Sequence, residues 1–291
     1  MESDIGSKAL VRRSEVLGEL EKALWSKGKS QATIRKYVRD AGKYLSYVQN
    51  KYGSEDCAYD RIILEEYRDH LLSVYKVTSV NSMIAGINYL LKIRGKEDLK
   101  LEACKVQRPA FREDIYHLTK EDYCALASRA EMEGNIRLSL LIQTLASTGI
   151  RISELQFITV EALESGRVEV SLKGKTRSVI LPGKLCSKLR TYCMRKGRKK
   201  GAVFVTRSGR PVDRSNVLHE LKRLSVRAGI DPAKVHPHNF RHLFAVTYYG
   251  MYKDISNLAD ILGHSNINTT RIYTALSRAE LERSIDNMGM L

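Results

Sequence analysis

The chain has 291 residues, of which 43% are hydrophobic, so it can bury more than one core and two domains are expected. Lysine and arginine number 49 against 33 aspartates and glutamates, and the formal net charge is +16. Such an excess favours a polyanionic partner, with nucleic acid ahead of an anionic membrane surface. No apolar run approaches the roughly 20 residues of a membrane span. The polar stretch from Met1 to Ser14 lacks the apolar region of a signal peptide, so we expect a cytoplasmic protein.

The five cysteines are scattered and odd in number, and no Cys-x-x-Cys pattern occurs. This usage predicts reduced thiols and excludes a disulfide framework or a cysteine zinc site. Cys186 and Cys193 could be reactive, but buried apolar packing is the favoured interpretation. We expect neither a metal nor a cofactor.

The first hundred residues show helical spacing of apolar side chains. Gly28 and Lys29 separate a helix over residues 15–26 from a second helix that Ser30 caps. A third helix is expected to begin near Asp60 and a fourth near Thr78. These elements predict a small helical domain over residues 8–104. A linker is predicted over residues 105–114, where charges and a proline interrupt the period.

Residues 115–291 mix helices with a short hairpin. Thr119 and Asp122 are spaced as a helix-capping pair, and residues 136–147 form a strongly apolar helix. Residues 167–172 and 177–181 alternate like strands on either side of a turn predicted over residues 173–176. Further helices are predicted over residues 184–195, 213–228, 238–249 and 255–262. The expected fold is therefore mainly α, with a helical bundle followed by an α+β domain that carries a small β-hairpin.

The first motif that could carry chemistry is Thr-Gly-Ile-Arg-Ile-Ser-Glu-Leu at residues 148–155. Transfer of a phosphodiester needs cations that neutralise the phosphate, a nucleophile, and a proton donor for the departing oxygen. Arginine suits this task because its planar, permanently charged fork matches phosphate oxygens. Arg151 follows a glycine at the end of an apolar helix, which would hold its charge rigidly. A helix-end arginine paired only with Glu154 is the structural alternative.

A second motif is His-Pro-His-Asn-Phe-Arg-His at residues 236–242. Spacing of three places His238 and Arg241 on one helical face, where both could hold one phosphate. A metal pair formed by His236 and His238 is disfavoured because acidic ligands are missing nearby. A structural histidine cluster is the other alternative.

The third motif is Leu-Gly-His at residues 262–264, followed by Thr-Thr-Arg-Ile-Tyr at residues 269–273. A free tyrosine has a pKa near 10, so Tyr273 needs neighbouring cations to act as a nucleophile. The chain has 15 tyrosines, and packing is the commoner role for any one of them.

In this order and at these spacings, the three motifs resemble those of the tyrosine recombinase (lambda integrase-like) family. The resemblance is nearest to its Xer-like and simple phage or transposon integrase members. It covers almost the whole chain, because Ser30, Thr33, Tyr37 and Asp40 also look like the opening of the family's helical core-binding domain. The resemblance therefore implies a core-binding DNA domain over residues 8–104 and a catalytic domain over residues 115–291.

The resemblance also implies catalytic roles. Arg151 and Arg241 match the pair that grips the scissile phosphate, and Tyr273 matches the nucleophile that forms a 3′-phosphotyrosyl bond. His238 matches a proton acceptor and phosphate ligand. His264 matches a second histidine that hydrogen-bonds the phosphate.

Two further residues are matched. Glu154 corresponds to an acidic residue that orients the site, and a hairpin lysine would protonate the departing 5′ oxygen. The family pattern Gly-Lys-Gly-x-Lys-x-Arg favours Lys173 for that lysine, over Lys175. This chain departs from the pattern, because Leu172 replaces the first glycine and one residue is missing before Lys175.

The expected function is site-specific recombination that cuts and rejoins double-stranded DNA, for integration, excision or dimer resolution. A type IB topoisomerase-like enzyme shares this chemistry, and a catalytically silent DNA-binding protein is a second alternative. The resemblance implies a tetramer on DNA, and it leaves open an accessory protein or a sister recombinase. Residues 277–288 are expected to form a tail helix that packs on a neighbouring protomer or on its own domain.

Overall fold

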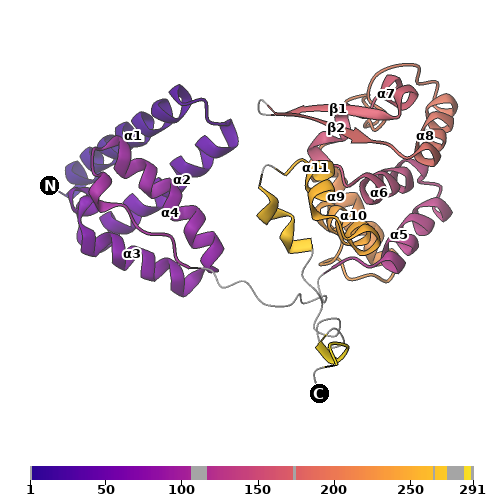
Figure 1. The fold of residues 1–291 in the computed structure, drawn as a ribbon. Helices are drawn as coiled ribbons and strands as arrows, with labels where there is room; N and C mark the ends of the chain where they lie inside the picture. Colours follow the sequence, from indigo (N-terminus) through magenta and orange to yellow (C-terminus); the bar gives the residue numbers. More distant parts are fainter. Residues whose placement is uncertain (1, 106–116, 173–174, 265, 274–284, 290–291) are drawn as a thin grey trace. The chain divides into compact units, whose positions relative to one another are not determined.

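The computed structural model describes residues 2–105, 117–172, 175–264, 266–273 and 285–289 (Figure 1). The chain divides into two compact units, Met1–Arg108 and Pro109–Leu291. The predicted fold class is confirmed, because helices dominate both units and the second carries a two-stranded antiparallel sheet. No helix among the described residues is long and apolar enough to cross a membrane.

Unit 1 is a helical bundle. Its elements are α1 (Glu2–Ser26), α2 (Gln31–Tyr52), η1 (Glu55–Tyr59), α3 (Arg61–Val74), α4 (Val77–Ile93) and η2 (Glu97–Leu99). The predicted caps are confirmed: Ser30 accepts from the backbone N–H of Thr33, and Asp60 accepts from those of Ile62 and Ile63. The prediction for the first helix was wrong, because α1 begins at Glu2; its polar first half contains no proline that would stop a helix.

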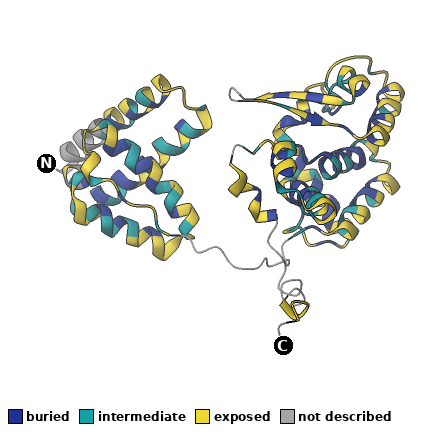
Figure 2. Ribbon diagram, in the orientation of Figure 1, coloured by how far each residue is buried: buried dark blue, intermediate teal, exposed yellow. Residues whose placement is uncertain are grey.

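The core of unit 1 forms where the apolar faces of these helices meet. Leu20, Ile34, Leu64 and Ile87 come from four different helices, and each is almost completely buried. Figure 2 colours the buried residues of the chain dark blue. Tyr44 is also fully buried, and its hydroxyl donates to the carbonyl of Ala58 at 2.5 Å. This bond satisfies the polar end of an aromatic core residue and attaches η1 to α2.

Unit 2 surrounds the apolar helix α6. Its helices are α5 (Lys120–Met132), α6 (Ile136–Thr148), α7 (Val160–Ser165), α8 (Gly183–Arg195), α9 (Arg214–Arg227), α10 (Pro237–Tyr252) and α11 (Ile255–Leu262). Its 3-10 turns are η4 (Ile152–Phe157), η5 (Ile267–Thr269) and η6 (Arg271–Tyr273). Leu138, Leu141 and Leu145 of α6 are buried, and α5, α8 and α10 pack around this helix. The predicted capping pair at Thr119 and Asp122 is confirmed.

The hairpin consists of β1 (Arg167–Leu172) and β2 (Lys175–Ile180). Its register pairs Val168 with Val179, Val170 with Arg177 and Leu172 with Lys175. The turn predicted over residues 173–176 was therefore too long, because Lys175 and Thr176 continue the ladder of β2. Lys173 lies outside the described residues, as do residues 277–284 of the expected tail helix.

The C-terminal elements of unit 2 build a smaller apolar cluster. Ala245 of α10, Leu258 and Leu262 of α11, and Tyr273 of η6 are buried against one another. The cluster packs α11 and η6 against α10. It thereby places the second and third sequence motifs side by side.

Candidate active site

The end of α6 carries the first motif. Gly149 closes the helix in the left-handed conformation at φ +60, and a β-carbon there would lie 2.6 Å from Cδ1 of Phe244. The position therefore demands glycine for both its backbone and its space. The chain turns there, and Arg151 becomes the N-cap of η4. The glycine turn thus sets the direction in which Arg151 leaves the core.

Glu154 lies at the centre of a buried charge cluster. Arg151 donates to Glu154 from its backbone N–H and from Nη1, both at 2.9 Å, and Arg177 donates from Nη2 at 2.5 Å. Burial alone would raise the pKa of Glu154, but the hydrogen bonds from Arg177 and Arg151 outweigh it and lower that pKa. Glu154 is thus a fixed anion that orients two guanidinium groups.

The ion pair between Arg151 and Glu154, which the structural alternative predicts, is present. It leaves part of the Arg151 guanidinium exposed. The side chain of Arg151 stays 40% exposed, whereas Glu154 is only 3% exposed. The carboxylate holds one edge of the guanidinium, and the rest of that side chain can meet an anion from solvent.

Arg241 is anchored from the opposite side, on α10. It is 3% exposed, and it donates from Nη1 to the carbonyl of Gly149 at 2.7 Å and from Nη2 to that of Leu262 at 2.6 Å. These bonds join the first motif to the third. Burial, together with repulsion from Arg151 and Arg177, lowers the pKa of Arg241 to about 10. Arg241 still carries its charge near neutral pH, in a cluster where cations outnumber carboxylates.

His264 is held between Arg241 and Thr270. Its Nε2 lies 3.0 Å from Nη2 of Arg241, and its Nδ1 lies 2.8 Å from the hydroxyl of the fully buried Thr270. A guanidinium can only donate, so Nε2 accepts and the proton sits on Nδ1, which donates to Thr270. Burial and the repulsion from Arg241 lower the pKa of His264 to about 4, which fits the neutral ring.

His238 is the second residue of α10, the helix that also carries Arg241, and it is exposed at the surface. Partial loss of water around the ring, followed by repulsion from Arg241 and Arg151, lowers its pKa. A neutral, accessible imidazole next to two arginines can accept a proton. His236 lies beside it with ring centroids 6.5 Å apart, and no group of metal-ligating side chains occurs among the described residues.

Tyr273 ends η6 and is 2% exposed. Its ring lies 6.1 Å from that of His264, nearly parallel, and 5.2 Å from that of His242, edge-on. The structure thus brings together Arg151, Glu154, Arg241, His264 and Tyr273, with His238 at the edge of the group. Lys173 lies outside the described residues.

Sequence reasoning missed three side chains of this cluster. Arg177, on the inner face of the hairpin, donates to Glu154 and to the carbonyl of Ile261, and its Nε is buried without a partner in the described chain. The hydroxyl of Thr270 accepts a hydrogen bond from Nδ1 of His264, and the ring of His242 stacks on that of His117 with centroids 4.0 Å apart. Two signals were available: alternation along β2, which places Arg177 two residues before the buried Val179, and the final arginine of the hairpin pattern, which falls on Arg177.

Comparison with known proteins gives one family match and several long relatives. The model of the phage integrase family matches residues 117–280. Tyrosine recombinase XerA of Pyrococcus furiosus is 27% identical over 287 residues, covering 96% of each chain. Tyrosine recombinase XerD of Vibrio cholerae is 26% identical over 294 residues, covering 95% of this chain and 97% of its own.

Solved structures show the same fold. XerH site-specific recombinase bound to a palindromic difH substrate, in a post-cleavage complex, superposes with a TM-score of 0.71 at 20% identity. That match covers 92% of this chain and 83% of the XerH chain. A lambda integrase dimer bound to a core site superposes with a TM-score of 0.69 at 17% identity, covering 89% and 94% of the two chains.

Proposed function

Because this chain belongs to the phage integrase family of tyrosine recombinases, we propose that it is a site-specific DNA recombinase that cuts and rejoins strands through a 3′-phosphotyrosyl intermediate. The observation that carries the proposal is the charge imbalance of the cluster. Three guanidinium groups, those of Arg151, Arg177 and Arg241, surround the single buried carboxylate of Glu154. A phosphate diester is an anion that would balance the excess positive charge of this rigid cluster.

In the proposed reaction the phenolic oxygen of Tyr273 attacks the scissile phosphorus. A bond forms between phosphorus and the tyrosine oxygen, and the bond to the 5′ oxygen breaks. The phenolic proton passes to His238, and Lys173 protonates the departing 5′ oxygen. One phosphoester replaces another, so no nucleotide hydrolysis is required, and a 5′-hydroxyl from another strand can reverse the attack.

The other residues stabilise the transition state. Arg151 contacts the phosphate from its exposed edge and Arg241 acts from the buried side, while the neutral His264 accepts a hydrogen bond from Arg241 and orients that guanidinium. Arg241 is preorganised, because two backbone carbonyls fix it before substrate arrives. Tyr273 is buried in this structure, so we infer that η6 shifts when DNA binds and brings the hydroxyl to the phosphorus.

Double-stranded DNA is the proposed substrate, and unit 1 is the proposed core-binding domain. We further propose a tetramer on DNA and a cytoplasmic location. The lambda integrase relative is a dimer on a core site, which supports self-association on DNA. The net charge of +16 supports the DNA substrate.

The proposal is tested by mapping covalent protein–DNA junctions across a genome that carries the gene, and then building a nicked suicide substrate from the mapped site. The wild type should become trapped on this substrate and should exchange strands between two marked duplexes. Relaxation of supercoils without any exchange would assign the chemistry to a topoisomerase-like enzyme. Binding without a covalent adduct would assign a silent DNA-binding protein.

A further inference from the structure

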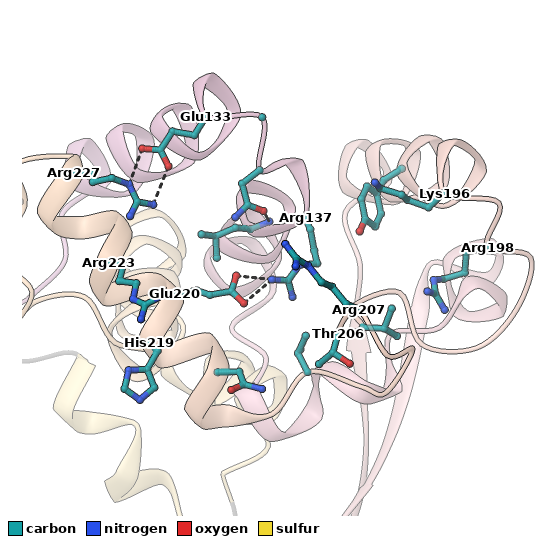
Figure 3. Close-up of a pocket in the computed structure, with 17 residues that line it drawn as sticks. Glu133, Arg137, Lys196, Arg198, Thr206, Arg207, His219, Glu220, Arg223 and Arg227 are labelled. Carbon is teal, nitrogen blue, oxygen red and sulfur yellow. Dashed lines mark hydrogen bonds and ion pairs between the residues drawn. The ribbon is translucent and has the colours of Figure 1, made fainter.

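A second concentration of cations lines a pocket of about 1120 Å³ in unit 2 (Figure 3). Its walls come from α9, the start of α6, the end of α8 and the loop after Phe204. None of the residues of the candidate active site lines it. The pocket is therefore a separate feature of this domain.

Two ion pairs hold its walls. Nη2 of Arg137 lies 2.6 and 2.5 Å from the two carboxylate oxygens of Glu220. Arg227 donates to both oxygens of Glu133, from Nε at 2.8 Å and from Nη2 at 2.9 Å. The dashed lines in Figure 3 mark these contacts, which join α9 to α6 and to the end of α5. They also engage both acidic residues of the lining.

The remaining cations have no such partner. Arg198, Arg207, Arg223 and Lys196 come from three separate segments, and within the described part of the chain none of their side chains forms an ion pair or hydrogen bond. Like charges that share a concave surface repel one another unless an anion sits between them. Their convergence on one pocket therefore indicates an anionic ligand.

Helix α9 lines this pocket with one face and contacts the segment before α10 with another. Lys222 donates to the carbonyl of Pro232, and the charges of Lys222 and Arg214 act on His236. Helical spacing puts Arg223 and Arg227 on a different face of α9 from Lys222, and that face lines the pocket. A phosphate held in the pocket would thus be distinct from one held by Arg151.

We propose that this pocket is a second phosphate-binding site, which takes a ligand with two or more closely spaced phosphates. Arginine forks match phosphate oxygens, and Arg207 and Arg223 are free to provide them. The half-buried ring of Tyr192 and the apolar Val212 add a surface on which a base or sugar could pack. Two sources share this chemistry: a free nucleoside polyphosphate, or the backbone of DNA away from the cleavage point. The second source rests on the proposed function.

The test uses the full chain in three forms: wild type, Arg207→Ala with Arg223→Ala, and Arg151→Ala. Inorganic tripolyphosphate is titrated into each by calorimetry. The double variant should lose a binding event or weaken it at least about tenfold, and Arg151→Ala should retain it. Lys184→Ala with Lys199→Ala removes two exposed cations outside the pocket and should match the wild type.

A random-sequence duplex of 40 base pairs separates the two sources. If DNA occupies the pocket, the double variant should reduce the slope of log affinity against log salt by about two relative to the lysine control. If tripolyphosphate binding falls and the DNA slope does not change, the ligand is a free polyphosphate. Equal tripolyphosphate binding and equal DNA slopes in the double variant and the lysine control would overturn the proposal. Neither readout needs strand cleavage, so a failure of the proposed recombinase chemistry would be seen separately.

Discussion

Arg177 holds Glu154 by an Nη2–Oε2 hydrogen bond of 2.5 Å while its Nη1 donates to the carbonyl of Ile261 at 2.6 Å. One side chain of β2 thus links the carboxylate that orients Arg151 to the end of α11, immediately before His264. The hairpin is attached to both halves of the candidate site by this arginine.

We expect Arg177→Met to destabilise the protein by about 3 kcal/mol, because it leaves the buried Glu154 with fewer partners. Urea unfolding should show this as a lower midpoint with an unchanged slope. Adding Glu154→Gln should recover part of the loss, because the orphaned charge is removed. If the costs of the two single changes simply add, the coupling between these residues is absent.

Gly263→Ala should disturb the site more than a glycine change at another helix end. Gly263 has φ +64, and an added β-carbon would overlap Cδ of Arg177. Gly53 caps α2 with a similar φ of +71 and has no atom within 4 Å of that position. We expect Gly53→Ala to cost about 1 kcal/mol from backbone strain alone, and Gly263→Ala to cost clearly more. Equal costs in thermal unfolding would contradict the close packing against Arg177.

The free energy of unfolding should fall as the pH is lowered from 6.5 toward 4, the range between the unfolded and folded pKa values of His264. Its pKa of about 4 in the folded protein lies below the ordinary 6.5, so the unfolded chain binds more protons between these values. The contribution is complete above pH 6.5 and is lost as the pH drops toward 4, by about 2 kcal/mol after allowance for partial exposure. The difference in unfolding free energy between wild type and His264→Gln should therefore shrink over this range. A difference that stays constant from pH 7 to 4 would be inconsistent with the lowered pKa.

Affinity for DNA should depend steeply on salt. If six or more phosphates are neutralised, raising the salt from 50 to 200 mM should weaken binding by on the order of 10³. Fluorescence anisotropy with Tyr273→Phe measures this without covalent trapping. An affinity that does not change with salt concentration would exclude contacts with the DNA phosphate backbone as the main source of binding.

Much of the fold was predictable because the residues that begin and end its helices act on their immediate neighbours. Ser30, Asp60 and Thr119 cap helices through their own side chains, and Gly28 and Gly149 end helices in the left-handed conformation. Such signals need only a few neighbouring residues. The start of α1 was missed because a polar helix carries no apolar period to mark it.

The candidate site was predictable as a set of residues but not as a network. The motifs indicated Arg151, Arg241 and Tyr273, because family patterns preserve order along the chain. The bond from Arg241 to the carbonyl of Gly149 joins positions 92 residues apart and depends on how α10 packs on α6. The contacts of Arg177 were not predicted either, because its partners lie far away in the sequence, on η4 and at the end of α11. Tertiary packing decides these contacts, and no local pattern encodes them.

The covalent link itself offers the most direct measurement. Protein trapped on a suicide substrate is digested with trypsin and nuclease, and the peptide that retains a nucleotide is sequenced by mass spectrometry. We expect the adduct on Tyr273 within the peptide Ile272–Arg278, and no adduct in Tyr273→Phe. An adduct on any other residue, or one that persists in Tyr273→Phe, would contradict the assignment of the nucleophile.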